Sequence, residues 1–352
     1  MPHADVVIAG AGIIGLATAL ELASTGAGVT VFERGQAMSE SSWAAAGMLA
    51  AHDPENPYAL RPLSELSLQL YPAFLAKVES LSGKAVPILS TQTLQGVHSL
   101  PPNTHRLSPE TIQALAPGLQ TNGLLFYLLE EQSLNPRDLA AALPAAVKAA
   151  GITLHQQTAV TAVESQHGSI QIQTTNGSFT AAHFINACGA WAAELSGIPI
   201  IPRKGQILVV EHPELYADQH LTAVIRTPHL YLVPRGARRV LIGATDEHAG
   251  YDKHVDPAAI TALHNAASEL FPPIRHAHVV DAWSGLRPAS ADSLPILGEL
   301  APHSWLALGH FRNGILLAPA TARLVRQMVL GERLSIDTHA FSPGRFATSL
   351  TE

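Results

Sequence analysis

The stretch that decides the fold reads DVVIAGAGIIG at residues 5–15, and a segment with helical character follows it at residues 16–24. A second short apolar run, GVTVF, comes next at residues 28–32. Short β-branched runs of this kind predict strands that are buried on both faces of a sheet. Two such strands around one helix predict a βαβ unit and an α/β fold.

Each glycine of the turn has its own role. Gly10 permits a tight turn, Gly12 lets the backbone approach a pyrophosphate, and Gly15 lets the helix pack closely on the strand. The helix N-terminus offers N–H groups to the phosphates, and Glu33 at the end of the second strand can accept hydrogen bonds from a ribose hydroxyl. A plain βαβ turn is the alternative, but the order of all these parts favours a dinucleotide site. Glu33 argues against a 2′-phosphate, although the neighbouring Arg34 weakens that point.

The segment after the second strand is made mostly of small residues. It reads SESSWAAAGML at residues 39–49 and is too poor in large apolar groups to be a core segment. Such a segment suits backbone that lies close against a flat ligand, and a tightly packed loop without a ligand is the alternative. With a single GxGxxG motif in the chain, a disulfide-reductase type of enzyme that uses NAD(P)H is disfavoured.

The composition excludes several classes of function. Of the 352 residues, 47% are hydrophobic and 14% are charged, and the net charge is −7 without blocks of one sign. This pattern argues against a nucleic-acid stripe and against a polybasic membrane patch. The apolar opening at residues 6–22 contains glycines, lacks a basic flank and is too short for a membrane span. We therefore expect a soluble, cytoplasmic protein without nucleic-acid or membrane partners.

The cysteine and histidine content points to neither a disulfide nor a metal. Cys188 is the single cysteine, so no internal disulfide is possible and a reducing compartment fits best. Because no basic residue adjoins Cys188, we expect a small buried hydrophobe rather than a nucleophile. His276 and His278 could share a strand face, but they lack a third ligand, and no metal is expected.

Secondary-structure signals switch from α/β to β-rich and back along the chain. Residues 87–97 predict one strand, and residues 184–191 predict an apolar strand that returns beside the first one. Antiparallel signals fill residues 207–245, with a hairpin around Arg235–Arg239. We therefore predict a discontinuous Rossmann-type nucleotide domain with an inserted antiparallel β-sheet domain that binds the substrate. The predicted division assigns residues 1–83, 137–200 and 281–352 to the first domain and residues 84–136 and 201–280 to the second.

Two segments towards the C-terminus contain residues that are not typical of an ordinary hydrophobic core. WSGLRP at residues 283–288 sets Arg287 between a Gly-Leu turn and a proline, and an arginine that pairs with a surface carboxylate is the alternative. GHFRNGILLAPAT at residues 309–321 lies at a strand-to-helix junction and offers a second helix N-terminus to a ligand. His229 and Tyr231 lie two apart on a predicted strand, so we expect them to face the same side.

These segments together resemble the FAD-dependent glycine oxidases of thiamine biosynthesis and the wider D-amino-acid oxidase group. The resemblance covers essentially the whole chain. It rests on five motifs in order, which are VIAGAGIIG at 7–15, AAAGML at 44–49, YLVPR at 231–235, WSGLRP at 283–288 and GHFRNGILLAPAT at 309–321. It implies a glutathione-reductase-like FAD-binding domain with an inserted substrate domain. FAD is expected to be non-covalent, because no cysteine lies near the C-terminus.

The resemblance also implies which residues contact FAD. They come from the glycine turn, the end of the second strand, the small-residue segment, two later strands and the C-terminal motif. The implied set is Gly10, Gly12, Ile13, Ile14, Gly15, Glu33, Arg34, Ser41, Ser42, Ala46, Gly47, Met48, Val160, Gly189, His310, Phe311, Arg312, Asn313, Gly314, Ile315 and Leu316.

The substrate site that the resemblance implies centres on Arg287, which would hold the carboxylate of an amino acid. A guanidinium suits this task because its planar fork fixes orientation as well as charge. Tyr231, Arg312 and His229 are implied to line the pocket. The reaction implied is the oxidative deamination of glycine or related small amines and D-amino acids, with dioxygen as acceptor and hydrogen peroxide as product. No general base is nominated.

The chain departs from the family pattern at Asp246, where glycine oxidase has a methionine in its pocket. An aspartate makes the site negative unless it is protonated or paired with His229 or Arg226, and we expect a changed substrate range. The alternative is that Asp246 turns outward and touches solvent only.

Other functions remain open at this stage. They are a dehydrogenase that passes electrons to a quinone or carrier, a secondary-amine oxidase similar to sarcosine oxidase, and an FAD-binding protein without turnover. The resemblance also implies a homo-oligomer, with a tetramer suggested.

Overall fold

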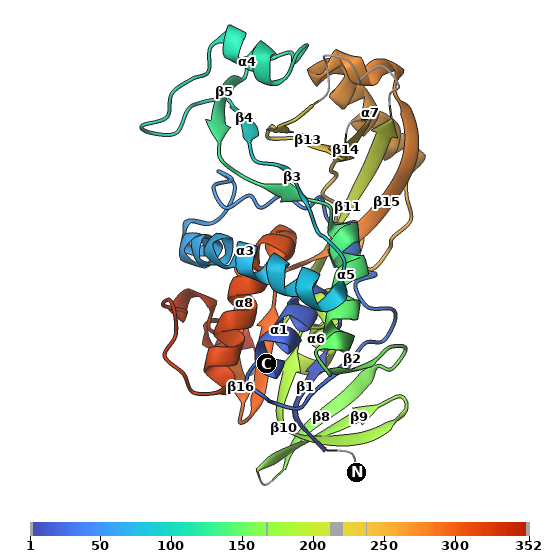
Figure 1. Cartoon of the computed structure of the whole chain (residues 1–352), viewed down its shortest axis with the longest axis vertical. Coiled ribbons are helices and arrows are strands. Elements are labelled where there is room, and N and C mark those ends of the chain that lie inside the picture. Colours follow the sequence, from blue (N-terminus) through green and yellow to red (C-terminus); the bar gives the residue numbers. More distant parts are fainter. Residues whose placement is uncertain (1–2, 167, 212–220, 237, 350–352) are drawn as a thin grey trace.

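The computed structural model describes residues 3–166, 168–211, 221–236 and 238–349. Its strands form two large sheets towards opposite ends of the molecule, and long helices lie against the first sheet (Figure 1). The first sheet has eight strands in the order β16-β17-β10-β1-β2-β7, with β9 paired to β10 and β8 to β9. These strands are β1 (His3–Ala9), β2 (Val29–Phe32), β7 (Thr153–His155), β8 (Val160–Gln166), β9 (Ser169–Thr174), β10 (Gly177–Asn186), β16 (Ile296–Ala301) and β17 (Ser304–Leu308).

The predicted βαβ unit is confirmed. Strand β1 leads into helix α1 (Ile13–Ala23), and β2 pairs with β1 in parallel. Strand β10 lies on the other side of β1, also in parallel, as the apolar segment 184–191 predicted. The difference is that residues 177–186 form one continuous strand, and the chain after Asn186 turns into a short helical segment instead of extending the strand.

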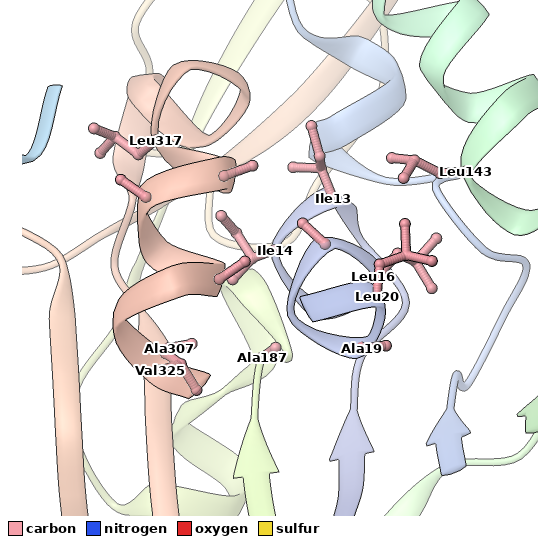
Figure 2. Packing of buried hydrophobic residues seen from close by; sticks show 14 of the residues in the cluster. Ile13, Ile14, Leu16, Ala19, Leu20, Leu143, Ala187, Ala307, Leu317 and Val325 are labelled. Carbon is pink, nitrogen blue, oxygen red and sulfur yellow. The ribbon is translucent and has the colours of Figure 1, made fainter. Parts of the chain in front are cut away.

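Four helices bury the core of this half of the molecule. They are α1, α3 (Arg61–Ser82), α5 (Pro136–Ala149) and α8 (Gly314–Val329). Helix α1 is apolar on nearly every side because it lies on the sheet and has α8 and α5 as neighbours. Figure 2 shows Ile14 directed towards α8, and Leu16 directed towards Leu143 of α5. Asn135 caps α5 by accepting from the N–H of Arg137 at 3.2 Å.

The second sheet has seven strands in the order β15-β11-β14-β13-β12-β4-β5. These strands are β4 (Thr93–Val97), β5 (Leu125–Leu129), β11 (Ile201–Glu211), β12 (Val224–Arg226), β13 (Tyr231–Pro234), β14 (Arg239–Gly243) and β15 (His278–Ala289). The hairpin of β13 and β14 around residues 235–239 is confirmed. The predicted strand 87–97 is wrong as one unit, because β3 (Ile88–Ser90) pairs with β6 (Ser133–Leu134) in a separate ribbon and only β4 joins this sheet.

The remaining elements are short or peripheral. The α-helices are α2 (Ser41–Ala44), α4 (Pro109–Leu115), α6 (Ala193–Ser196) and α7 (Pro257–Leu270). The 3-10 turns are η1 (Tyr58–Leu60), η2 (Gly189–Trp191), η3 (Pro272–His276), η4 (Phe311–Asn313), η5 (His339–Phe341) and η6 (Pro343–Ser349).

Each sheet has its own hydrophobic core, and a third, small cluster joins the two parts. Leu20 and Leu316 belong to the core of the first half, and Leu232 and Phe271 to that of the second. The joining cluster brings the small-residue segment at Ala44 and Ala46 against the second sheet. The division into two domains stays a prediction. Strand β15 crosses its boundary at residue 281 and pairs with β11 of the second sheet along its length.

Candidate active site

A cavity of about 790 Å³ lies where the two sheets meet. Its walls come from the ends of β1 and β2, the small-residue segment, η4, and strands β11, β13 and β15. All but two of the site residues predicted from sequence line it, and the two that do not are Gly15 and Leu316. The cavity therefore brings together residues that are up to three hundred positions apart in the chain.

The glycine turn at the start of α1 is held by close contacts that only glycine permits. Gly10 has φ +100°, and a Cβ there would lie 2.4 Å from the carbonyl oxygen of Ala187. A Cβ on Gly15 would lie 1.9 Å from the carbonyl oxygen of Gly10. Gly15 thus serves the packing of helix on strand, while Gly10 and Gly12 line the cavity at the helix N-terminus.

Glu33 and Arg34 lie at the carboxyl end of β2, on the cavity wall. The Glu33 carboxylate accepts from the N–H groups of Ala11 and Gly35, both at 2.8 Å, which ties the acid to the glycine turn. Arg34 stacks over the ring of Trp191 with 3.4 Å between its Cζ atom and the ring centroid. Its charge is therefore partly engaged by an aromatic face on the rim of the cavity.

The small-residue segment is fixed between the cavity and the second sheet. Trp283 donates from Nε1 to the carbonyl oxygen of Ala44 at 3.0 Å, and Arg235 donates from Nη2 to that of Ala46. Burial lowers the pKa of Arg235 to about 10, which leaves it charged at neutral pH. Gly47 has φ +75°, and its Cβ would lie 2.1 Å from the carbonyl oxygen of Leu134.

These features fit a flavin nucleotide. The N-terminus of α1 can face a pyrophosphate, Glu33 a ribose, and the flat backbone at Ala46–Met48 a ring system. A shared cavity between a Rossmann-type sheet and a second sheet leaves room for a substrate at the far end. Val160, Gly189 and η4 complete the wall on the side of the first sheet.

Arg287 and Tyr231 lie in the cavity wall formed by the second sheet, and we call this part of the cavity the substrate end after the role predicted for them. Arg287 lies within β15, directly opposite Arg203 of β11, so the predicted Gly-Leu turn before it is wrong: the segment is extended and paired throughout. The Arg287 guanidinium donates from Nη1 to the carbonyl oxygen of Thr245 at 3.2 Å and lies beside the Tyr231 hydroxyl. Burial raises the pKa of Tyr231, although Arg287 opposes the shift, so the phenol stays protonated at neutral pH.

Two glycines, which sequence reasoning missed, make room for these side chains. A Cβ on Gly205 would lie 2.3 Å from Nη2 of Arg287, and a Cβ on Gly243 would lie 2.4 Å from the Tyr231 hydroxyl oxygen. Gly243 opens the Gly-Ala-Thr stretch that precedes Asp246, but nothing in the sequence around either glycine indicates this role. The signal is their register in the second sheet, which only the strand pairing reveals.

Arg312 and His229 line the same cavity, but their surroundings differ from the expectation. The Arg312 guanidinium donates to Glu55 and, at 3.3 Å, to Asn56, so the loop at residues 53–56 engages it. Sequence reasoning missed this acidic loop. His229 is exposed and precedes β13, which begins at Tyr231; the expectation that both stand on one strand is therefore wrong.

Asp246 lines the cavity, is hydrogen-bonded to Arg203 and lies near Arg287. Its carboxylate accepts from Nε of Arg203 at 3.0 Å and from Nη2 of Arg203, and it lies 3.9 Å from Nη1 of Arg287. The alternative in which it touches solvent only is wrong. So is pairing with Arg226, whose guanidinium lies 2.9 Å from Glu131.

His310 and Cys188 are structural in character. Nε2 of His310 lies 3.0 Å from the Thr321 hydroxyl, and burial lowers the pKa of His310 to about 3, so the ring is neutral at physiological pH. Cys188 is half-buried on the cavity wall, so the expectation of a buried group is met only in part; burial raises the pKa of its thiol to about 12, which does not fit a nucleophile.

Within the described ranges, no group of three His, Cys, Asp or Glu side chains is placed to hold a metal ion. Nor does any helix in that part of the chain have the length and apolar character to cross a membrane.

Fold and site together fit a flavin-nucleotide-dependent oxidoreductase, and the comparisons with known proteins identify its family. The sequence model of the family described as FAD dependent oxidoreductase (DAO) matches residues 5–328. The chain belongs to the DAO family of FAD-dependent oxidoreductases. The predicted FAD cofactor and the α/β FAD-binding fold are thereby confirmed.

Among similar proteins, glycine oxidase of Geobacillus kaustophilus is 33% identical over 368 residues, with 96% of each chain covered. The crystal structure of glycine oxidase from Geobacillus kaustophilus matches with a TM-score of 0.90 and 31% identity, covering 97% of this chain and 98% of that one. The bifunctional protein ThiO/ThiG of Trichormus variabilis is 36% identical over 346 residues, which cover 94% of this chain but 53% of that protein. The chain thus spans about half the length of this relative. The predicted resemblance to glycine oxidases is confirmed.

Proposed function

We propose that this chain oxidises glycine or closely related small amines, including D-amino acids, to the imino acid, with dioxygen as acceptor and hydrogen peroxide as product. The observation that carries the proposal is the Arg287–Tyr231 pair at the substrate end, with Gly205 and Gly243 leaving space for it. The likeness to glycine oxidases over nearly the whole chain supports it.

The residues at this end suit an amino acid that enters by its carboxylate. Arg287 is half-buried and presents a planar fork, which can bind both carboxylate oxygens and fix their orientation. The protonated Tyr231 hydroxyl can donate a further hydrogen bond to the same group. FAD, when bound, supplies the two-electron acceptor for oxidation of the C–N bond.

No acidic side chain near Arg312 is assigned as a base for the amine of the substrate. Asp53 lies 3.5 Å from Arg312 and 3.7 Å from Arg226, and Glu55 is paired with Arg312. Both carboxylates are therefore engaged by arginines, and neither is assigned as a base. We propose that the amine enters neutral and that the walls orient it and exclude water. Arg312 and His229 then act at the edge of the pocket, with His229 at its exposed side.

A panel of amines tests the proposal. Glycine, sarcosine, D-alanine and D-proline are mixed with the holoenzyme in air, and peroxide release is measured; the same amines are added without oxygen to follow bleaching of the flavin absorbance. We expect bleaching and peroxide with at least one of them. Bleaching without peroxide, together with rapid reduction of a dye, would instead support a dehydrogenase. If none of these amines bleaches the flavin, the proposed function is wrong.

Two further properties, the compartment and the assembly, are also proposed. We propose a reducing compartment such as the cytoplasm, since Cys188 is the only cysteine. We also propose a homo-oligomer, by analogy with the family alone. Light scattering of the purified holoenzyme measures the mass, and a monomer at micromolar concentration would contradict this second point.

A further inference from the structure

Three charged side chains meet beside the proposed carboxylate site. Arg203 of β11 pairs across the sheet with Arg287 of β15, so their side chains start from directly opposed positions. Asp246, three residues after the end of β14, reaches both. Its carboxylate makes two parallel contacts with Arg203, from Nε at 3.0 Å and from Nη2, but stays 3.9 Å from Nη1 of Arg287.

The unequal distances matter because Asp246 carries the same chemical group as the substrate. A carboxylate tethered this close has an effective concentration in the millimolar range or higher, so it can compete with a free amino acid for Arg287. Arg203 occupies both oxygens of Asp246 in the fork geometry that arginine and carboxylate prefer. While that fork holds, Arg287 keeps donors for a second carboxylate.

We propose that Arg203 is a positioning residue that holds Asp246 away from Arg287 and so keeps the carboxylate site of Arg287 available to the substrate. The proposal rests on the proposed function, since it assumes that Arg287 receives the substrate carboxylate. It also names the substrate class. Two arginines and one aspartate leave a net charge of +1 here, which matches an amine with one carboxylate and disfavours one with two.

Four variants of the holoenzyme separate this role from a structural one. Arg203→Met removes the partner of Asp246, Arg203→Lys keeps the charge without the fork, and Asp246→Asn removes the competing carboxylate. The fourth variant combines Arg203→Met with Asp246→Asn. The matched control is Arg239→Met. Arg239 of β14 forms an ion pair with Glu211 of β11 at 2.8 Å, at the end of the β11–β14 pair opposite to Arg203 and Asp246.

Two readouts are used. Glycine gives kcat and KM, and glycolate, which has the carboxylate but no amine, gives a Kd from its perturbation of the flavin absorbance. For Arg203→Met we expect KM and the glycolate Kd to rise about tenfold, with kcat within about twofold, because a freed carboxylate competes in the ground state. The double variant should return to within about threefold of the parent, and Arg203→Lys should fall between. Asp246→Asn should bind glycolate at least as tightly as the parent and should gain activity on iminodiacetate relative to glycine.

The double variant decides the matter. If it binds glycolate as weakly as Arg203→Met alone, Arg203 does not act through Asp246 and the proposal is overturned; an unchanged Kd in Arg203→Met overturns it too. If Arg203→Met loses its flavin, Arg203→Lys and Asp246→Asn are used in its place. The proposal is then overturned if Arg203→Lys binds glycolate with the parent's Kd and Asp246→Asn gains no activity on iminodiacetate. Failure of the parent to oxidise any amine refutes the proposed function, but glycolate binding still tests Arg203.

Discussion

The two ends of the cavity are built in different ways. At the cofactor end, the glycine turn, α1 and Glu33 lie within one βαβ unit, and their contacts run largely to backbone atoms. At the substrate end, Arg203, Tyr231 and Arg287 come from three strands of the second sheet, and their contacts run mostly between side chains, with one bond from Arg287 to the backbone carbonyl of Thr245. One end depends on a local backbone shape, and the other on the register of distant strands.

This difference decides what a substitution does. A Cβ at Gly15 would meet the carbonyl oxygen of Gly10 at 1.9 Å, which is backbone and can shift only with the turn. A Cβ at Gly205 would meet the end of the Arg287 side chain at 2.3 Å, which can move at little cost to the fold. Damage to the cofactor end should therefore appear as lost flavin and stability, and damage to the substrate end as a raised KM.

The largest effect on substrate binding is expected for Arg287→Ala. Loss of one partner of a buried charge pair costs about 3–5 kcal/mol, so KM for glycine should rise by about a hundredfold to several thousandfold. Arg287→Lys should bind almost as poorly, because it keeps the charge but loses the planar fork. Flavin content should stay near that of the parent in both, as Arg287 lies at the substrate end. A KM within about threefold of the parent, with flavin retained, would show that Arg287 does not hold the carboxylate.

A second substitution, Gly15→Ala, should break the cofactor end instead. Forcing a methyl group against backbone in a packed interior typically costs about 1–3 kcal/mol. We expect lower flavin content and a lower Tm, while KM for the remaining holoenzyme is unchanged. Gly28→Ala in the same βαβ unit is the control, since its Cβ would meet only the Asp5 side chain, at 3.3 Å. Equal flavin content in the two variants would contradict the role assigned to Gly15.

The contrast also explains what the sequence could predict. The βαβ unit, the strand beside it and the cofactor residues follow from spacing and glycine chemistry, which act over a few residues. Arg287 could be singled out from the sequence as a residue unsuited to a core, but its role and that of Tyr231 followed only from the family resemblance. The Arg203–Asp246 pair, Gly205 and the loop that binds Arg312 could not be foreseen, because strand register and long-range charge pairing set them.

Substitution Gly205→Ala should produce a smaller effect of the substrate kind. The added methyl group overlaps the Arg287 guanidinium, which must swing aside, so KM for glycine should rise about tenfold while Tm changes by little. Gly344→Ala is a control, since the nearest atom to its Cβ is the Ser342 hydroxyl oxygen at 3.5 Å. A fall in flavin content without a change in KM would assign Gly205 to the cofactor end and erase the distinction drawn between the two.

The smallest effect is expected at Cys188, which lies on the cavity wall at the cofactor end, near Glu33 and Arg34. Burial raises the pKa of its thiol to about 12, so only about one thiol in ten thousand is ionised at pH 8. Since the thiolate is the reactive form, iodoacetamide at pH 8 should alkylate Cys188 far more slowly than it alkylates free cysteine. Cys188→Ala should keep kcat/KM within about twofold and retain its flavin, because a slightly smaller apolar side chain replaces a thiol that takes no part in the chemistry. Rapid alkylation of Cys188 in parallel with loss of activity would show a reactive thiol at the cofactor end. It would contradict the interpretation that this end consists mainly of backbone contacts.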